Sequence, residues 1–492
     1  MAAQREQWGT RAGFILAAVG SAIGLGNIWR FPATAYEAGG GAFLIPYLVA
    51  LLTAGIPLLI FEYAVGHRTR SSPPRAFRTL SRAAQPLGWW QVAICFVIAT
   101  YYAVIIAWAL RYALFSLDLQ WGDDTEGFFL GFLGAAESPG MISKYLPGLV
   151  VPLILVWAIT LGILALGVKK GVERANKIFI PLLVVTFGAL VVRSTFLDGA
   201  ADGLNAFFTP DWDRVFDTNV WLLVYGQLFL SLSVGFGIMI TYASYLRRRA
   251  ELTGAALVAG FANSSFEILA GIGVFSALGY MATTTGVAVD DVVQGGPGLA
   301  FMALPQIVSE MPAGRLFGLL FFFSLVIAGL TSLISIVQVL ISAVQDRTGW
   351  SRLPAVGVVG GFTAAVSIAV FPTDQGLSIL DAADNFINKY GITLAALTAI
   401  VVVGWMMRKL PELRGHVNAV SELKLGVWWI VALGVITPLM LAWIIVNDLI
   451  NELKAPYGEM PLNFLYVTGW GVAIGAIVFG LLASLAPWRD SD

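Results

Sequence analysis

Residues 20–27 read GSAIGLGN, and residues 231–237 read SLSVGFG. Both stretches interrupt long apolar runs, and both are rich in glycine and small polar residues, which weaken a helix interior. Close helix packing through small residues would explain either stretch alone. At membrane depth, however, unwound backbone is tolerated only where it lines a cavity or is covered by protein. The two stretches together therefore predict two broken membrane-spanning helices around a shared site.

The composition of the chain supports a membrane protein. Of the 492 residues, 58% are hydrophobic and 12% are charged, whereas charged residues make up about 25% of an ordinary soluble domain. A soluble fold has too little interior to bury so much apolar surface. The formal net charge of −1, with basic residues scattered over short segments, argues against a nucleic-acid partner.

Residues for metal-dependent or nucleophilic chemistry are almost absent. Cys95 is the only cysteine and lies in an apolar run, so an intramolecular disulfide cannot form. His67 and His416 are the only histidines, and both fall in polar connectors. A zinc site, a haem site or a catalytic triad therefore lacks its side chains, and we do not expect an enzyme. Residues 1–10 are polar and do not resemble a removable signal peptide.

Twelve apolar runs are long enough to cross the hydrocarbon core, which takes about 20 helical residues. They lie near residues 11–37, 41–67, 87–117, 148–168, 174–196, 218–246, 252–283, 314–345, 353–371, 377–407, 423–447 and 461–487. We therefore predict an all-α polytopic membrane protein with 12 transmembrane helices, which forms a single transmembrane domain over residues 1–492.

The glycine-rich stretches fall in the first and sixth runs, so broken helices recur five spans apart. Because five is odd, two successive five-helix units run in opposite directions across the membrane. We expect two inverted repeats, spans 1–5 (residues 11–196) and spans 6–10 (218–408), followed by two extra helices (421–487).

Basic residues alternate from one loop to the next. If the N-terminus is cytoplasmic, the inner segments hold 21 of the 29 Lys and Arg residues, and the outer loops are acidic. The positive-inside rule therefore places both termini in the cytoplasm. We expect a multi-pass protein of the cytoplasmic membrane whose arginine-rich first inner loop contacts lipid headgroups. The sequence leaves a homodimer open.

Broken helices supply ligands for an anion and for a hard cation. The N-terminus of a half-helix presents N–H groups and a positive dipole end to an anion. Freed carbonyls and nearby side-chain oxygens can replace the water shell of Na⁺, whereas nothing here suits a soft metal. Suitable side chains are those of Asn27, Ser231, Asn263, Thr331 and Ser332.

The residues around the two breaks also resemble a known family. The matching stretches are REQW at 5–8, GSAIGLGNIWRFP at 20–32, GGGAFLIP at 39–46, YY at 101–102, QLFLSLSVGFGIMITYASY at 227–245 and AGLTS at 328–332. On these motifs the chain is similar to the neurotransmitter:sodium symporters, and specifically to prokaryotic amino-acid transporters of that family. The resemblance covers spans 1–10 and implies sodium-coupled symport by alternating access.

The resemblance implies two sodium ions. The first would bind the carbonyl of Ala22, the side chains of Asn27, Ser231 and Asn263, and the substrate carboxylate. The second would bind the carbonyls of Gly20, Ile23 and Ala328 and the hydroxyls of Thr331 and Ser332. Taken alone, the last two hydroxyls could equally bond back to their own helix.

The resemblance also implies a substrate site. The carboxylate would meet N–H groups near Gly24, Leu25 and Gly26 and the hydroxyl of Tyr102. The amine would meet backbone carbonyls of the first and sixth spans, and Ala22 and Ser231 also belong to the substrate site. The side chain would face Ile98, Leu230, Ser233, Phe236, Ser332 and Ile336. Taken alone, Tyr102 could be an ordinary packed tyrosine.

Gly24 indicates the class of substrate. Monoamine transporters of this family have an aspartate there, so a glycine requires the substrate to bring its own carboxylate. No charged residue can be placed in the side-chain pocket, where an unpaired charge would be costly. We therefore predict a neutral, hydrophobic amino acid. Leu230 departs from leucine-transporting relatives, which have an aromatic residue there, so an aromatic amino acid is as plausible as leucine.

Glu267 lies one helical turn after Asn263, where chloride-dependent relatives have a serine. A carboxylate there can supply the negative charge itself, so we predict chloride-independent transport. Glu267 can also protonate on the return step and carry H⁺ back. The alternative is a structural carboxylate bonded to neighbours such as Gln227, which would not affect chloride independence.

Charges inside a membrane are costly and therefore usually paired. We pair Arg30 with Asp384 as an outer gate and Arg5 with Asp346 as an inner gate. Trp8 would cap the inner gate and Tyr245 would bond nearby, while Tyr102 and Phe236 would form a thin lid above the substrate.

Other classes of function fit the sequence less well. A channel would need a continuous polar stripe or charged rings, and none is evident. Two alternatives stay open: a sodium-coupled carrier of an osmolyte or γ-amino acid, and a transport-inactive receptor that binds an amino acid.

Overall fold

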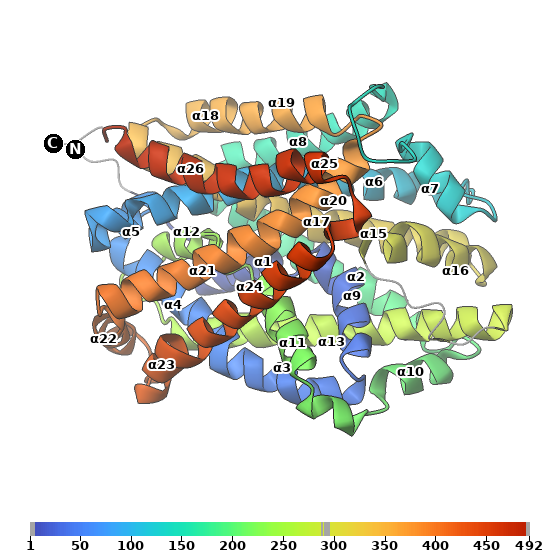
Figure 1. The fold of residues 1–492 in the computed structure, drawn as a ribbon, viewed down its shortest axis with the longest axis horizontal. Coiled ribbons are helices and arrows are strands. Elements are labelled where there is room, and N and C mark those ends of the chain that lie inside the picture. The colour runs from blue at the N-terminus through green and yellow to red at the C-terminus, as the bar shows by residue number, and fades with distance from the viewer. Residues whose placement is uncertain (1–4, 287–288, 290–295, 489–492) are drawn as a thin grey trace.

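The structure is a computed structural model that describes residues 5–286, 289 and 296–488. Its helices pack lengthwise into one bundle (Figure 1). The described residues contain no β-strand and only two isolated bridges, Gly40 with Pro210 and Tyr145 with Thr373. The predicted all-α fold is confirmed.

Ten helices of the described residues are long and apolar enough to cross a membrane. Several join α-helices through short 3-10 or π-helical turns. In chain order they are Gly41–Thr69 with α3 (Leu44–Ala50) and α4 (Ile56–Thr69), Arg82–Phe115 with α6 (Gln85–Phe115), Pro147–Ala165 with α8 (Val150–Ala165), Val168–Ser194 with α9 (Glu173–Ser194), α13 (Thr253–Thr285), α17 (Gly314–Thr348), Arg352–Val370 with α18 (Arg352–Ala355) and α19 (Gly361–Val370), Gly376–Met406 with α20 (Gly376–Phe386) and α21 (Thr393–Ile400), Val427–Glu459 with α23 (Val427–Val431) and α24 (Thr437–Lys454), and Leu462–Leu485 with α25 (Leu462–Leu465) and α26 (Gly471–Leu485).

Two further spans are broken. α1 (Arg11–Ala22) and α2 (Leu25–Glu37) pass the same test together and are bent by 56° across Ile23 and Gly24. α11 (Thr218–Ser231, 14 residues) and α12 (Ile238–Ser244, 7 residues) are separated by residues 232–237, and each alone is too short to cross. With these two pairs, each of the twelve predicted spans has a counterpart, and both breaks fall within the predicted stretches.

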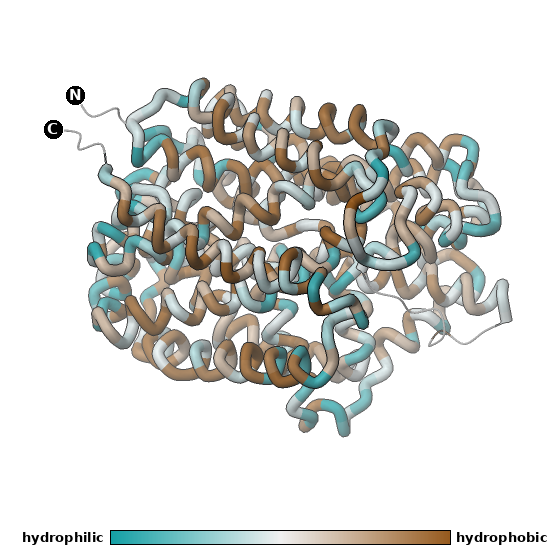
Figure 2. Tube along the Cα trace, turned by 45° about the horizontal axis from the view of Figure 1, so that its top comes forward, coloured by the Kyte–Doolittle hydropathy of each residue, from teal (hydrophilic) through white to brown (hydrophobic). Residues whose placement is uncertain are grey.

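Shorter helices lie in the connectors, which the apolar runs do not cover. They are α5 (Pro73–Leu80), α7 (Thr125–Leu133), α10 (Ala200–Phe208), α15 (Gly296–Gly298), α16 (Leu304–Glu310) and α22 (Leu410–Val420). In Figure 1, α5 and α22 lie at one end of the bundle, and α7, α10 and α16 lie at the other. Figure 2 shows hydrophobic residues along the helices and hydrophilic residues gathered towards the two ends.

The third and eighth spans form the centre of the bundle. In their most apolar windows, 83% of the residues of Arg82–Phe115 and 89% of those of Gly314–Thr348 are buried, against 28% for Leu462–Leu485. α6 and α17 are therefore surrounded by protein, whereas the last span lies at the periphery with its apolar residues exposed.

Two histidines, His67 and His416, connect α22 to the rest of the bundle through hydrogen bonds. Nε2 of His67 lies 2.8 Å from the carbonyl oxygen of Arg247, so it carries the proton. Nδ1 of His67 then accepts from Nε2 of His416, at 2.9 Å. Arg68 forms an ion pair with Glu412 beside them. Burial first, and then the charges of His67 and Arg68, lower the pKa of His416 from 6.5 to about 4.

This shift predicts acid sensitivity. Between pH 6.5 and 4 the unfolded chain binds a proton at His416 that the folded chain does not, so stability falls as pH drops through this window. The effect is about 1 kcal/mol after allowance for the partial exposure of His416, or about 1–2 °C in Tm. Thermal unfolding in detergent at pH 7 and pH 5 should show a smaller fall in Tm for His416→Gln than for the wild type. An equal fall in Tm in both proteins would contradict the prediction.

Candidate functional site

The break in the first span is held by its own side chains. The N–H of Gly24 donates to Oδ1 of Asn27 at 2.8 Å, so Asn27 closes the first turn of α2. The N–H of Leu25 donates to the hydroxyl of Tyr102 at 3.1 Å. A Cβ at Gly24 would lie 2.8 Å from that hydroxyl oxygen and 3.1 Å from Oγ of Ser332. Only glycine leaves the space between these groups free.

The break in the sixth span needs left-handed backbone. Ser233, Gly235 and Gly237 have φ angles of 53°, 93° and 86°, a region that glycine enters without steric cost. Oε1 of the buried Glu62 accepts from the N–H of Gly235 at 2.7 Å. Oγ of Ser233 donates to the carbonyl of Ser21 at 2.8 Å, which joins the two breaks.

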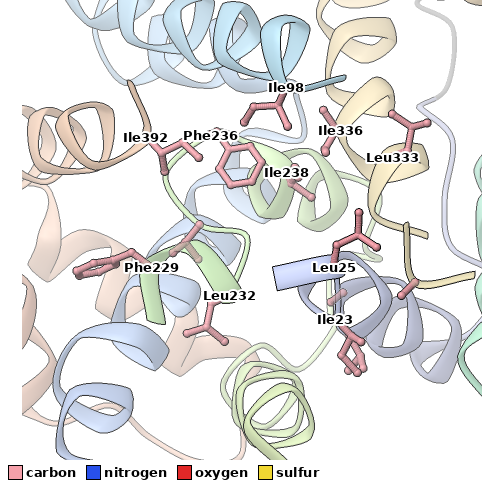
Figure 3. Close-up of a cluster of buried hydrophobic side chains, with 14 of the residues drawn as sticks. Ile23, Leu25, Ile98, Phe229, Leu232, Phe236, Ile238, Leu333, Ile336 and Ile392 are labelled. Carbon is pink, nitrogen blue, oxygen red and sulfur yellow. The ribbon is translucent and has the colours of Figure 1, made fainter. Parts of the chain in front are cut away.

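A cavity of ≈260 Å³ lies between the two breaks. All twelve residues predicted to bind substrate line it: Ala22, Gly24, Leu25, Gly26, Ile98, Tyr102, Leu230, Ser231, Ser233, Phe236, Ser332 and Ile336. Ile105, Ile238, Ile392 and Tyr457 also line it, and sequence reasoning missed them. Ile105 lies two helical turns after Ile98, so its position on α6 was the available signal. In Figure 3 the Phe236 ring lies among Ile98, Ile238, Ile336 and Ile392.

Three of the residues predicted for the first sodium form a buried chain. Nδ2 of Asn27 donates to Oδ1 of Asn263 at 2.9 Å, and Nδ2 of Asn263 donates to Oγ of Ser231 at 3.0 Å. They come from α2, α13 and α11, so three spans converge on one polar cluster next to the cavity. Amide and hydroxyl oxygens are ligands that suit a hard cation.

The residues predicted for the second sodium lie where the end of α1 meets α17. Oγ of Ser332 lies 3.3 Å from the carbonyl oxygen of Ser21 and 3.4 Å from that of Ile23. Thr331 instead donates to the carbonyl of Ala328 in its own helix, at 2.9 Å. Gly20 packs against Asn176 of α9 so closely that a Cβ would collide with its Oδ1. Of the two hydroxyls, Ser332 therefore reaches the break and Thr331 bonds locally.

Glu267 is fully buried one turn beyond Asn263. It accepts a hydrogen bond from the hydroxyl of Tyr47, and Nε2 of Gln227 donates to its Oε1 at 2.8 Å. The bond to Gln227 is the one that a structural carboxylate would make. The same geometry places a carboxylate beside the Asn263 cluster, so the contacts are compatible with both interpretations.

The predicted pair Arg30–Asp384 is formed at one end of the cavity, at 3.2 Å. The hydroxyl of Tyr101 donates to Oδ1 of Asp384 at 2.8 Å, and Nδ2 of Asn388 donates to the same oxygen at 2.9 Å. Three partners therefore hold one carboxylate, of which sequence reasoning identified only the arginine.

The predicted pair Arg5–Asp346 is formed at 2.6 Å. Arg5 also donates to Oγ of Ser244 at 2.7 Å and lies 4.8 Å from the centre of the Tyr245 ring. Nε1 of Trp8 donates to the carbonyl of Tyr242 at 2.8 Å. Both predicted gate pairs are thus formed at the same time.

A second ion pair beside Arg5 was not predicted. Arg352 pairs with Glu6 at 2.9 Å and donates to Oε1 of Gln338 at 2.7 Å. Nε2 of Gln338 donates in turn to the hydroxyl of Tyr245 at 2.7 Å. Glu6 lies 346 positions from Arg352, and Tyr245 lies 93 positions from Gln338, so no local pattern signals the network.

Asp346 should be important for turnover rather than for substrate binding. Besides Arg5, its carboxylate accepts the N–H of Ser72 at 2.6 Å, and it lies outside the cavity. In Asp346→Asn we expect substrate turnover to fall by more than about tenfold, because a charged partner of Arg5 is lost. Sodium-dependent substrate binding, measured on purified protein, should change by less than about threefold. Equal loss of binding and turnover would contradict this assignment.

Comparison with known proteins gives a consistent result. The model of the sodium:neurotransmitter symporter family matches residues 5–129 and 141–488. An uncharacterized sodium-dependent transporter of Methanocaldococcus jannaschii is 44% identical over 97% of this chain and 96% of its own length. The human sodium- and chloride-dependent GABA transporter 2 is 32% identical over 70% of this chain, which spans 62% of that protein's length.

A solved structure has the same fold. The crystal structure of MhsT in complex with L-phenylalanine matches with a TM-score of 0.75 at 33% identity, over 90% of this chain and 100% of that chain. The predicted family, the helical membrane fold and the use of sodium are confirmed. This chain belongs to the sodium:neurotransmitter symporter family and is a sodium-dependent membrane transporter, not an enzyme.

Proposed function

We propose that the protein imports a neutral, hydrophobic or aromatic amino acid together with sodium and without chloride. The observation that carries this proposal is the lining of the cavity, which is apolar in one part and polar in another. Ile98, Phe236 and Ile336 make one part apolar, while the first turn of α2 and the Tyr102 hydroxyl border the other. Such a cavity suits a zwitterion with an apolar side chain.

The carboxylate end would lie at Gly24 and the N-terminus of α2. A helix N-terminus stabilises an anion through its free N–H groups and its dipole. Charged residues of the cavity, Arg30, Asp381 and Asp384, lie at the end that bears the gate pair. A charged substrate side chain would therefore lack a partner among Ile98, Phe236 and Ile336.

Coupling would arise because the substrate carboxylate is itself a ligand of the first sodium. The Asn27–Asn263–Ser231 cluster supplies oxygens beside the cavity, and the substrate carboxylate would complete the set. Each then raises the affinity of the other. A second sodium at Ser332, Ile23 and their neighbours would tie α1 to α17, so we propose two ions per substrate.

Alternating access would follow from the opposed repeats, residues 11–196 and 218–408. We place the Arg30–Asp384 pair on the outer side, and Arg5–Asp346 with both termini on the cytoplasmic side, as the distribution of basic residues indicates. Opening one pair while the other stays closed would expose the cavity to one side at a time.

The test is uptake of radiolabelled neutral amino acids into proteoliposomes, with a sodium gradient or a potassium control, each in chloride and in gluconate. We expect uptake that requires sodium and ignores chloride, with phenylalanine and leucine among the best substrates. The neighbour MhsT was crystallised with L-phenylalanine, which favours an aromatic substrate.

Similarity to GABA transporters keeps a γ-amino-acid carrier as the second candidate. Competition of GABA and taurine against leucine and tryptophan separates the two. Sodium-dependent binding of an amino acid with no uptake under any gradient would favour a receptor instead.

A further inference from the structure

The face of α6 that borders the cavity extends past it towards the break in the sixth span. Ile98 and Tyr102 line the cavity. Gln91 and Cys95 precede them at helical spacing on the same face and are 1% and 0% exposed. A glutamine buried in a membrane-spanning helix is costly unless it has partners, so its bonding indicates its role.

Both side chains bind carbonyls of the unwound segment 232–237. Nε2 of Gln91 donates to the carbonyl of Gly235 at 3.1 Å, and the thiol of Cys95 donates to the carbonyl of Phe236 at 3.1 Å. From α4, Glu62 accepts the N–H of Gly235. Side chains of two helices therefore replace the bonds that the broken helix cannot make.

These bonds act on a wall of the cavity. The Phe236 ring lies among the apolar residues of the pocket (Figure 3). The glycines on either side of Phe236 have positive φ angles and carry no side chain that could hold the backbone. The bonds to the carbonyls of Gly235 and Phe236 therefore restrain the backbone that carries the ring.

We propose that Gln91 and Cys95 are positioning residues that set the position of Phe236 in the cavity and thereby the size of substrate side chain that is accepted. The proposal rests on the proposed function, because it takes this cavity to hold the substrate side chain. Neither residue touches the substrate; both act through the backbone of segment 232–237.

Two glutamines of α6 provide a matched test. Gln85 is also buried, and its Nε2 donates to the carbonyl of Ser484 in α26 at 3.1 Å, away from the cavity. In Gln91→Leu, we expect KM for the preferred substrate to rise about tenfold, because a buried carbonyl loses its donor, and the preference between leucine and phenylalanine to shrink. Gln85→Leu loses the same kind of bond, together with the bond that Arg78 donates to Oε1 of Gln85 at 3.1 Å, and should leave KM and preference unchanged. Equal effects in the two variants would overturn the proposal.

The single thiol offers a readout that does not depend on transport. Because Cys95 is the only cysteine, the protein has one S–H stretching band in the infrared, and Cys95→Ala identifies it. We expect the wild-type band at the position of a bonded thiol, moving towards that of a free thiol in Gln91→Leu but not in Gln85→Leu. Cys95→Ser, which keeps a donor, should retain more of the wild-type substrate preference than Cys95→Ala.

The two readouts separate the possible failures. If the wild type takes up no amino acid but the thiol band behaves as expected, the proposed function is wrong. The conclusion that Gln91 and Cys95 hold segment 232–237 in place is then still supported. A wild-type band at the free-thiol position, or a KM in Gln91→Leu equal to that of the wild type, would overturn the positioning role.

Discussion

In Gly24→Asp, uptake of α-amino acids should fall by more than about a thousandfold. A Cβ at Gly24 would lie 2.8 Å from the Tyr102 hydroxyl and would displace it from the N–H of Leu25. The added carboxylate would also face the proposed position of the substrate carboxylate, and juxtaposed like charges cost several kcal/mol. Steady-state uptake of phenylalanine or leucine into proteoliposomes measures the loss.

Gly24→Ala separates the two causes, since it adds the Cβ without the charge. We expect uptake to fall about tenfold in this variant, which corresponds to the loss of one hydrogen bond to a charged group. Gly188→Ala in α9 meets no atom within 4 Å and should match the wild type. If aspartate were no worse than alanine at Gly24, the substrate carboxylate would have to lie elsewhere.

In Glu267→Ser, we expect uptake to become dependent on chloride. Glu267 is fully buried and bonded to Tyr47 and Gln227 beside the Asn263 cluster. Serine removes a negative charge close to the proposed first sodium and opens space for an anion between donors that are already in place. Without chloride we expect a loss of about a hundredfold, since removing one partner of a buried charge pair costs about 3–5 kcal/mol, part of which water in the vacated space can offset. Chloride should restore most of it.

Glu267→Gln is the control for this experiment, because it removes the charge but keeps the volume. Uptake by this variant should be low in gluconate and should rise only a little in chloride. Uptake by the wild type that needs chloride would refute the role given to Glu267 but would leave the cavity argument intact. Unchanged uptake by Glu267→Ser in gluconate would favour the structural interpretation.

The features that the sequence predicts well are those with a local signal. Glycines at 24, 26, 235 and 237 mark the breaks because helix-weakening residues at membrane depth need a special reason. The apolar runs give the spans because backbone groups in lipid must be satisfied within a helix. The set of cavity residues depended also on the family resemblance, since spacing alone does not say that Leu230 and Ile336 line the same cavity.

The features that it missed are contacts between distant segments. Gln338 joins Arg352 to Tyr245, and Tyr457 reaches the cavity from the C-terminal end of the span Val427–Glu459. Neither belongs to a periodic pattern, because each contact is set by how whole helices pack. Gln91 did carry a signal, a polar residue inside an apolar run, but its partner is a backbone carbonyl that no residue type reveals.

The two breaks differ in length, and this difference has a consequence for divergence. Two residues, Ile23 and Gly24, separate α1 from α2. They bond to Ser332 and Asn27, which are proposed ligands of the sodium ions. Six residues separate α11 from α12, and these carry Phe236 and are held by side chains of other helices. Mutations in the longer break can alter what is recognised while the shorter one preserves energetic coupling. Within one lineage, substrate range would thus drift faster than ion dependence.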